Sequence, residues 1–281
     1  MRIFNTLFFS IGILFSFSCY SWNNIAHMVV ANIAYERLQP KTRLKVDKMV
    51  SDLATEYPNI TQFTQIAPWP DALRAQRLNA FNHWHYIDYA FSTDGTPLKN
   101  LVDSDNIIWV INQIEPLIKN TNANPFEHGR FLAFLVHVVG DIHQPLHTVS
   151  RISVEYPDGD RGGNLYRVRY PSGSGQLVNL HKLWDEGFNL FTGSQSQSNV
   201  LAISHMITEQ YPEEEFGSQV NDLNPENWAS EGMKLSANFV YSTPENQRPN
   251  DEYVNKAKTI VEQRVALAGY RLANLLNSML G

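Results

Sequence analysis

The sequence has 281 residues, of which 43% are apolar and 12% aromatic, with 22 basic residues, 28 acidic residues and a single cysteine. This composition is typical of a globular protein with a sizeable core, and it excludes a disordered chain, a collagen-like repeat and a small disulfide-stapled protein. The acidic balance argues against a general basic surface for polyanions, so any recognition of phosphate must be local.

An apolar segment lies near the start of the sequence. Residues 3–17 form the only long uncharged apolar run, and one basic residue precedes them. The run is shorter than the ~20 residues that a membrane-spanning helix needs. The small residues Cys19 and Ser21 follow it, so we predict that residues 1–21 are a secretory signal peptide and that cleavage leaves Trp22 as the first residue.

Removal of this segment changes the expected chemistry of the chain. Residues 22–281 contain no cysteine, and their 21 basic and 28 acidic residues give a formal charge of −7. We expect them to form a single domain that is secreted or periplasmic, monomeric and without stable membrane association. A lipoprotein with an acylated Cys19 is the alternative, but the residues before this cysteine lack the aliphatic side chain that is usual at such sites.

Apolar periodicity predicts a mainly α chain. The spacing of Ile25, Val29 and Ile33 indicates a helix at the start of the mature chain. Residues 131–143 are apolar on nearly every side, which indicates a buried central helix that is stopped by Pro145. The same periodicity predicts further helices over 107–118, 201–210, 226–241 and 251–280.

A strand signal occurs in one place. Residues 164–180 alternate between apolar and polar in two-residue steps about a Gly/Ser turn, which predicts a β-hairpin. Alternating β and α units are absent. We therefore predict one compact, mainly α domain with a single small hairpin.

Two of the nine histidines begin an H-x-x-x-D pattern, His137 with Asp141 and His181 with Asp185. On a helix such a pair projects from one face and can grip one metal ion. An isolated pair of this kind is more often a solvated surface pair. The first pair, however, lies among apolar residues, and a buried aspartate beside a histidine needs a compensating cation. We interpret it as part of a metal site.

Three further residues could complete metal sites. His147 follows the first pair beyond the expected bend at Pro145, and Asp71 and His85 are embedded among aromatic residues. A lone histidine or aspartate in such a setting is more often structural. Taken together, however, histidines and aspartates without cysteine match the nitrogen and oxygen donors that suit zinc in an exported hydrolase.

The expected cleavage site has a chemical consequence. Cleavage before Trp22 would free an α-amine close to His27 in the sequence. The amine and the carbonyl oxygen of one residue can chelate a metal ion, because an amine with a pKa of about 7.7–8.0 can yield its proton to a metal at neutral pH. Simple anchoring of the mature end by burial of Trp22 is the alternative, and the residues alone do not separate the two.

Six motifs occur in order along the chain: Trp22 with His27, Trp69-Pro70-Asp71 with Arg74, His85-Tyr86-Ile87-Asp88, His137-x3-Asp141-x5-His147, Asp160-Arg161-Gly162-Gly163-Asn164, and His181-x3-Asp185. The set closely resembles the zinc-dependent single-strand-specific nucleases of fungi and plants, the nuclease/3′-nucleotidase family that shares its fold with bacterial zinc phospholipase C. The resemblance covers nearly the whole mature chain. It implies the phospholipase C/nuclease-like fold.

The resemblance also implies three zinc ions per chain. The implied ligands are Asp71, His85, His137 and Asp141 for the first ion, the Trp22 amine and carbonyl, His27 and a shared Asp141 for the second, and His147, His181 and Asp185 for the third. Two zinc ions that share a carboxylate can activate a water molecule at neutral pH, and a third can stabilise the departing 3′ oxygen. The implied substrates are single-stranded DNA, single-stranded RNA and 3′-mononucleotides, and the implied products carry 5′-phosphates.

Other residues match positions at which the family contacts its substrate. Arg74 is implied near the phosphate, where a planar guanidinium spreads its charge over several oxygens, although a salt bridge to a ligand carboxylate is the alternative. Tyr86 and Asp88 match a pair that stacks on a nucleobase and hydrogen-bonds its edge, with core packing beside His85 as the alternative. Asn164 can meet a phosphate oxygen, or it can simply belong to a turn.

Two other classes of protein use similar residues. A zinc phospholipase C has nearly the same ligands, but its last ligand is usually glutamate, and it needs exposed apolar surface for contact with a bilayer. Asp185 and the Tyr86–Asp88 pair favour nucleotides over lipids. A non-catalytic zinc-binding protein would need closed coordination shells with no position left for water or substrate.

Overall fold

The computed structural model describes residues 22–120, 122–173 and 175–281. The predicted signal peptide, residues 1–21, lies outside the described residues. The longer helices are α1 (Asn24–Glu36), α2 (Pro40–Ala54), α5 (Ile107–Lys119), α6 (Pro125–Asp141), α8 (Gln197–Gln210), α9 (Pro225–Asn238) and α10 (Asp251–Leu280). The shorter ones are α3 (Phe63–Ile66), α4 (Trp69–Ala75), α7 (Leu180–Asp185) and the 3₁₀ helices η1 (Asn79–His85), η2 (Pro145–Thr148), η3 (Gly187–Asn189), η4 (Glu213–Asn221) and η5 (Val240–Ser242). The prediction of a mainly α fold is confirmed.

Helix α6 lies at the centre of the molecule. It packs against α1, α2, α4, α5 and α10, and its residues from Leu132 to Asp141 are all buried. The helix begins earlier than its apolar run, because the Asn124 side chain accepts a hydrogen bond from the Phe126 N–H and Pro125 occupies the first helical position. It ends at Asp141 rather than at the predicted His143. The predicted buried central helix is therefore correct in place and in burial.

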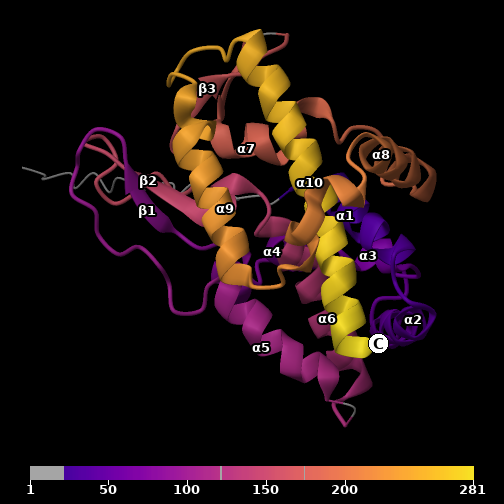
Figure 1. Cartoon of the computed structure of the whole chain (residues 1–281). Helices are drawn as coiled ribbons and strands as arrows, with labels where there is room; N and C mark the ends of the chain where they lie inside the picture. Colours follow the sequence, from indigo (N-terminus) through magenta and orange to yellow (C-terminus); the bar gives the residue numbers. More distant parts are fainter. Residues whose placement is uncertain (1–21, 121, 174) are drawn as a thin grey trace, which may run out of the picture.

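The longest helix, α10, runs from the top to the bottom of the view in Figure 1, with α9 to its left and α8 and α1 to its right. Its apolar face packs on α1, and the two helices meet closely at Gly269, where a Cβ atom would lie 2.5 Å from the Ile33 side chain. The C-terminal end reaches α2, where Lys41 donates a hydrogen bond to the Gly281 carbonyl. No helix of the described chain is long and apolar enough to cross a membrane.

Two small strand pairs complete the fold. The predicted hairpin is present as the antiparallel pair β3 (Arg167–Arg169) and β4 (Leu177–Asn179). The sequence did not predict the parallel pair β1 (Tyr89–Ser92) and β2 (Val149–Ile152), in which Tyr89 pairs with Val149. Each strand has only four residues, and the pairing joins distant parts of the chain, so no local pattern reveals it. The pair brings the segment after His85 alongside the segment after His147.

Candidate metal centre and cleft

The last turn of α6 carries the first H-x-x-x-D pair. His137 and Asp141 are fully buried, and Asp141 Oδ2 lies 3.0 Å from His137 Nε2. The same oxygen lies 3.1 Å from His85 Nδ1, at the end of η1. Asp71, in the first turn of α4, places Oδ1 3.8 Å from both of these ring nitrogens. The structure therefore brings together the four side chains that the family resemblance implied for one ion.

The other oxygen of Asp141 faces a different helix. Asp141 Oδ1 lies 3.3 Å from Nε2 of His27, which projects from α1 into the core. The His27 ring stacks on the His137 ring, with their centroids 4.0 Å apart. Asp141 is thus placed between two groups of histidines, with one carboxylate oxygen toward each, as a shared ligand requires.

Trp22 lies beside both groups. Its side chain is buried and donates a hydrogen bond from Nε1 to the Gly140 carbonyl, next to Asp141. The following N–H, that of Asn23, donates to the carbonyl of Asp185 at 3.1 Å. The anchoring of Trp22 by burial and the placement of its main chain near the acidic residues are thus both present in the structure.

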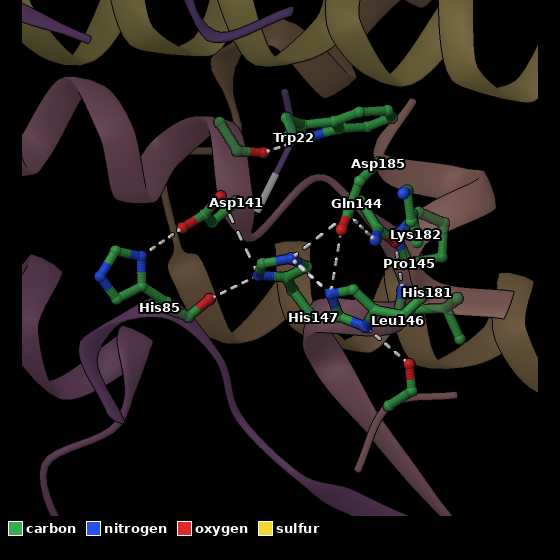
Figure 2. A network of polar contacts seen from close by, with 12 residues as sticks. Trp22, His85, Asp141, Gln144, Pro145, Leu146, His147, His181, Lys182 and Asp185 are labelled. Atoms are coloured by element: carbon green, nitrogen blue, oxygen red, sulfur yellow. Dashed lines mark hydrogen bonds and ion pairs between the residues drawn. The ribbon is translucent and has the colours of Figure 1, made fainter. Parts of the chain in front are cut away.

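A third cluster combines η2 and α7 (Figure 2). His147 Nε2 and His181 Nε2 lie 3.1 Å apart, and Asp185 approaches them with Oδ1 3.7 Å from the first and Oδ2 3.5 Å from the second. All three side chains are buried. The two H-x-x-x-D pairs therefore lie in neighbouring clusters of one centre.

Hydrogen bonds at Nδ1 fix the tautomer and the ring orientation of three of these histidines. The Nδ1 atoms of His137, His147 and His181 lie 2.8, 2.7 and 2.7 Å from the carbonyl oxygens of Ala67, His85 and Gly162, respectively. A carbonyl only accepts, so each Nδ1 carries a hydrogen, and in the neutral imidazole each Nε2 presents a lone pair. This arrangement is the usual one for histidines that bind metal ions.

The third cluster tests whether a cation fits. Because both of its histidines donate through Nδ1, two Nε2 lone pairs face each other at 3.1 Å, which is repulsive unless a positive charge lies between them. Asp185 Oδ2 is buried and has no hydrogen-bond partner among the described residues. Two imidazole nitrogens and one carboxylate oxygen placed in this way can bind one metal ion.

The pKa values of these buried groups follow from burial and from the charges around them. Burial raises the pKa of Asp185 to about 7, and a nearby cation would favour the ionised form of this carboxyl. Burial, together with the neighbouring His137, lowers the pKa of His27 and keeps its imidazole in the neutral form that binds metals. Burial also lowers the pKa of His137, but the Asp141 and Asp71 carboxylates outweigh it and raise this pKa to about 8.

Comparison with known proteins decides the family. A profile of the S1/P1 nuclease family matches residues 22–281. The chain belongs to the S1/P1 nuclease family. Nuclease S1 of Aspergillus oryzae is 27% identical over 92% of this chain and 91% of its own length, and Endonuclease 1 of Arabidopsis thaliana is 27% identical over 92% and 86%. Nuclease P1 of Penicillium citrinum is 24% identical over 92% and 98%. The predicted resemblance is confirmed, and the chain is thereby a nuclease-type hydrolase with candidate metal clusters.

A cleft of about 560 Å³ opens beside these His/Asp clusters. His181 and Leu146 are among its lining residues. The side chains predicted to contact substrate, Arg74, Tyr86, Asp88 and Asn164, all line it as well. The volume is within the range usual for small-molecule sites. The predicted substrate residues thus share one cavity with a predicted metal ligand.

Arg74 occupies the boundary between the clusters and the cleft. Its Nη1 lies 3.5 Å from Asp71 Oδ1, and its Nε donates to Asn82 Oδ1 at 3.1 Å. The salt bridge to a ligand carboxylate, one of the two predicted roles, is therefore present. Arg74 also lines the cavity, so it can contact a bound group while it holds Asp71.

Asp88 differs electrostatically from the acids of the clusters. Burial and the nearby carboxylates of Asp103 and Asp160 raise its pKa to about 7. Such a group can both donate and accept a hydrogen bond near neutral pH. Tyr86 is half-buried at the same wall, beside His83.

Sequence reasoning missed one residue that orders the third cluster. The Gln144 side chain is buried and donates from Nε2 to Asp185 Oδ1 at 2.7 Å, which turns Oδ2 toward His181. Its own carbonyl accepts the Leu146 N–H at 2.6 Å. The signal available was a polar residue between the end of an apolar helix and Pro145, where a turn exposes backbone groups that a side chain must satisfy.

Proposed function

We propose that the protein is a zinc-dependent nuclease that cleaves single-stranded DNA and RNA to products with 5′-phosphates and also removes phosphate from 3′-mononucleotides. The observation that carries the proposal is the set of three His/Asp clusters, buried except for the partly buried Asp71, of which two share His137, beside a cleft lined by an aromatic–acid pair. The nuclease names of the relatives support the substrate class.

The donor set favours three zinc ions. Residues 22–281 contain no cysteine, and the clusters offer only imidazole nitrogens and carboxylate oxygens, which suit zinc in a hydrolytic site. The proposed ligands are Asp71, His85, His137 and Asp141 for one ion, Trp22, His27 and Asp141 for a second, and His147, His181 and Asp185 for a third. When bound, zinc would acidify water and polarise a phosphate.

The chain's own residues would hold the substrate for this chemistry. Arg74 would donate to non-bridging phosphate oxygens while its contact with Asp71 keeps the guanidinium in place. The Asn164 amide would donate to a further oxygen at the cleft wall. These donors would orient phosphorus toward the clusters and offset the negative charge that grows on the oxygens during hydrolysis.

Single-strand preference would follow from the cleft. An unpaired base can turn into it, stack on Tyr86 and meet Asp88 with its edge. A base in a duplex is stacked and paired, and a stiff duplex cannot bend its backbone inward cheaply. Stacking tolerates any base, so cleavage would have low sequence specificity.

Export is part of the proposal. The family match begins at Trp22, the residue that the proposed cleavage leaves first, and the main chain at this point lies beside the clusters. Removal of residues 1–21 in the secretory pathway would convert the amide nitrogen of Trp22 into an amine. The processed protein would then be periplasmic or secreted, with a ligand that the precursor lacks.

The test is a substrate panel with the processed protein. Denatured DNA, RNA, duplex DNA, 3′-AMP and phosphatidylcholine are assayed with and without a chelator, followed by re-addition of zinc. We expect single strands and 3′-AMP to be hydrolysed, duplex DNA to be cut more slowly, and all activity to vanish with the chelator and return with zinc. Hydrolysis of the lipid alone would identify a phospholipase, and zinc-loaded protein inactive on every substrate would identify a non-catalytic zinc-binding protein.

A further inference from the structure

Arg161 has an unusual backbone conformation at the wall of the cleft. It begins a run of three residues with positive φ, at +58°, followed by Gly162 and Gly163. The left-handed region is natural for glycine but uncommon for arginine. Strained residues of this kind persist only where the surroundings hold them, and they gather at ligand sites.

Hydrogen bonds hold this conformation on both sides of the peptide. The Arg161 N–H donates to Ser150 Oγ at 3.1 Å. Its carbonyl accepts from the Asn164 N–H at 3.2 Å and from Asn164 Nδ2 at 2.9 Å. The backbone is therefore fixed between β2 and the substrate-facing turn, and the side chain starts from a defined point on the cleft wall.

The guanidinium of Arg161 differs from those of the other arginines in the cleft. Arg74 contacts Asp71 and Asn82, and Arg167 donates to the Leu177 carbonyl. Arg161 is exposed, and no ion pair or hydrogen bond engages its side chain within the described parts of the chain. An arginine that is positioned by its backbone but has no protein partner is available to a ligand.

Asp88 supplies complementary chemistry in the same cavity. Asp88 and Arg161 both line the cleft and form no ion pair with each other among the described residues, so each can contact a group bound in the cleft. Tyr86 lines the cavity too and offers a face on which such a group can stack. The cleft therefore presents a carboxyl, a fork of donors and an aromatic face.

Guanine matches these groups better than the other bases do. Its Watson–Crick edge offers N1–H and N2–H₂ to a carboxylate, and its O6 and N7 atoms accept two hydrogen bonds from one arginine. Adenine lacks the O6 acceptor and places an amino group there instead. Uracil has no adjacent pair of acceptors for one arginine. Cytosine can offer N3 and O2 to an arginine, but it then has only its N4 amino group for a carboxylate, where guanine has both N1–H and N2–H₂.

We propose that Arg161 is a specificity-determining residue that, together with Asp88, makes the cleft prefer guanine among the bases it accepts. The proposal rests on the proposed nuclease function and adds a preference to it. The competing role for an exposed arginine in a nuclease is contact with a phosphate of the strand. A phosphate contact carries no base information, so the two roles differ in their pattern over substrates.

The experiment measures kcat/KM for 3′-GMP, 3′-AMP, 3′-CMP and 3′-UMP with the processed protein and three variants. Arg161→Asn removes the guanidinium but retains a residue that tolerates positive φ. Arg161→Lys retains the charge but not the planar fork. Arg77→Asn is the matched control, because Arg77 is also an exposed arginine with positive φ, at +66°, and does not line the cleft.

We expect the wild type to favour 3′-GMP by roughly 10-fold or more, the usual worth of one bidentate arginine–guanine contact. Arg161→Asn and Arg161→Lys should both lose most of this preference, because kcat/KM falls for 3′-GMP and changes little for 3′-CMP and 3′-UMP. Arg77→Asn should retain it. Zinc content, measured in each variant, should stay at the wild-type value.

Three results would overturn the inference. The first is a wild type without base preference, and the second is an equal loss over all four substrates in Arg161→Asn. The third is full retention of the preference in Arg161→Lys, which would assign the effect to charge alone. A wild type that hydrolyses none of the four nucleotides, nor denatured DNA, would instead refute the proposed function.

Discussion

At the scale of single residues, Asp141 connects two of the candidate metal clusters. One oxygen of its carboxylate faces His85 and His137, and the other faces His27. Burial alone would raise the pKa of this carboxyl, but the neighbouring His137 and His147 rings outweigh burial and hold the pKa well below its ordinary value. The site therefore depends on a permanent negative charge at this point.

Asp141→Asn should remove that charge with almost no change of shape. We expect turnover on every substrate to fall on the order of 100-fold or more and the zinc count per chain to drop, because the neutral amide is a poor bridge between two cations. Metal analysis and 3′-AMP hydrolysis measure both effects. Asp52→Asn, at a partly buried position of α2 that pairs with Lys48 away from the clusters, is the control and should behave as the wild type. Wild-type activity with unchanged zinc in Asp141→Asn would remove the bridge from the mechanism.

At the scale of elements, the turn after Asp160 connects backbone geometry to the third cluster. Gly162 has φ +61°, and its carbonyl accepts the hydrogen bond from His181 Nδ1. A Cβ atom on Gly162 would lie 2.3 Å from the Leu146 carbonyl oxygen, which is backbone and cannot turn aside. Only glycine meets both conditions at this position.

Gly162→Ala should therefore lower both the free energy of unfolding and the zinc content. We expect a loss of roughly 2–5 kcal/mol in the free energy of unfolding from strain and overpacking, and loss of zinc from the third cluster because the acceptor that orients His181 shifts. Gly95→Ala isolates the first contribution, since Gly95 also has positive φ, at +81°, but open space at its Cβ. It should cost about 1–2 kcal/mol and leave zinc unchanged. Denaturant unfolding measures the stability of both variants, and metal analysis measures their zinc content. Equal effects in Gly162→Ala and Gly95→Ala would contradict the proposed link between this turn and the third cluster.

What the sequence predicted of these elements depends on the range of the signal. Helix α6 and the candidate ligands His137 and Asp141 were predictable, because periodicity and buried charge are local properties. The side-by-side placement of β1 and β2, and with it the approach of His147 Nδ1 to the His85 carbonyl, depends on tertiary pairing and was not. Helix α2 was missed as well, because its apolar residues are few and its core contacts come from α6.

The chemistry of the cleft shows the same limit at residue level. The types and order of Asp71, His85 and His181 indicated metal ligands, because few other functions use such a set. The side chain of Gln144 and the conformation of Arg161 carry no such signature. Their roles depend on a 2.7 Å contact with Asp185 and on a positive φ, both of which exist only in the folded chain.

At the scale of the whole molecule, the fold gathers six separate elements around one centre. Helices α1, α4, α6 and α7 and the 3₁₀ helices η1 and η2 each contribute at least one candidate ligand. The start of the family match is drawn into the same place, since Trp22 is buried against Gly140 and the next residue bonds to the Asp185 carbonyl. A cut before Trp22 would thus act directly on the centre.

The zinc count per chain in two forms of the protein tests most directly whether the amine of Trp22 completes the metal centre. One form begins at Trp22 after processing, and the other retains a methionine directly before it. An amide nitrogen is a poor donor at neutral pH because its lone pair is delocalised, so the extended form lacks one ligand while its core is unchanged. We predict three zinc ions per chain in the processed form and two in the extended form. Fewer than three in the processed form, or equal counts in both, would contradict a three-zinc centre completed by the N-terminus.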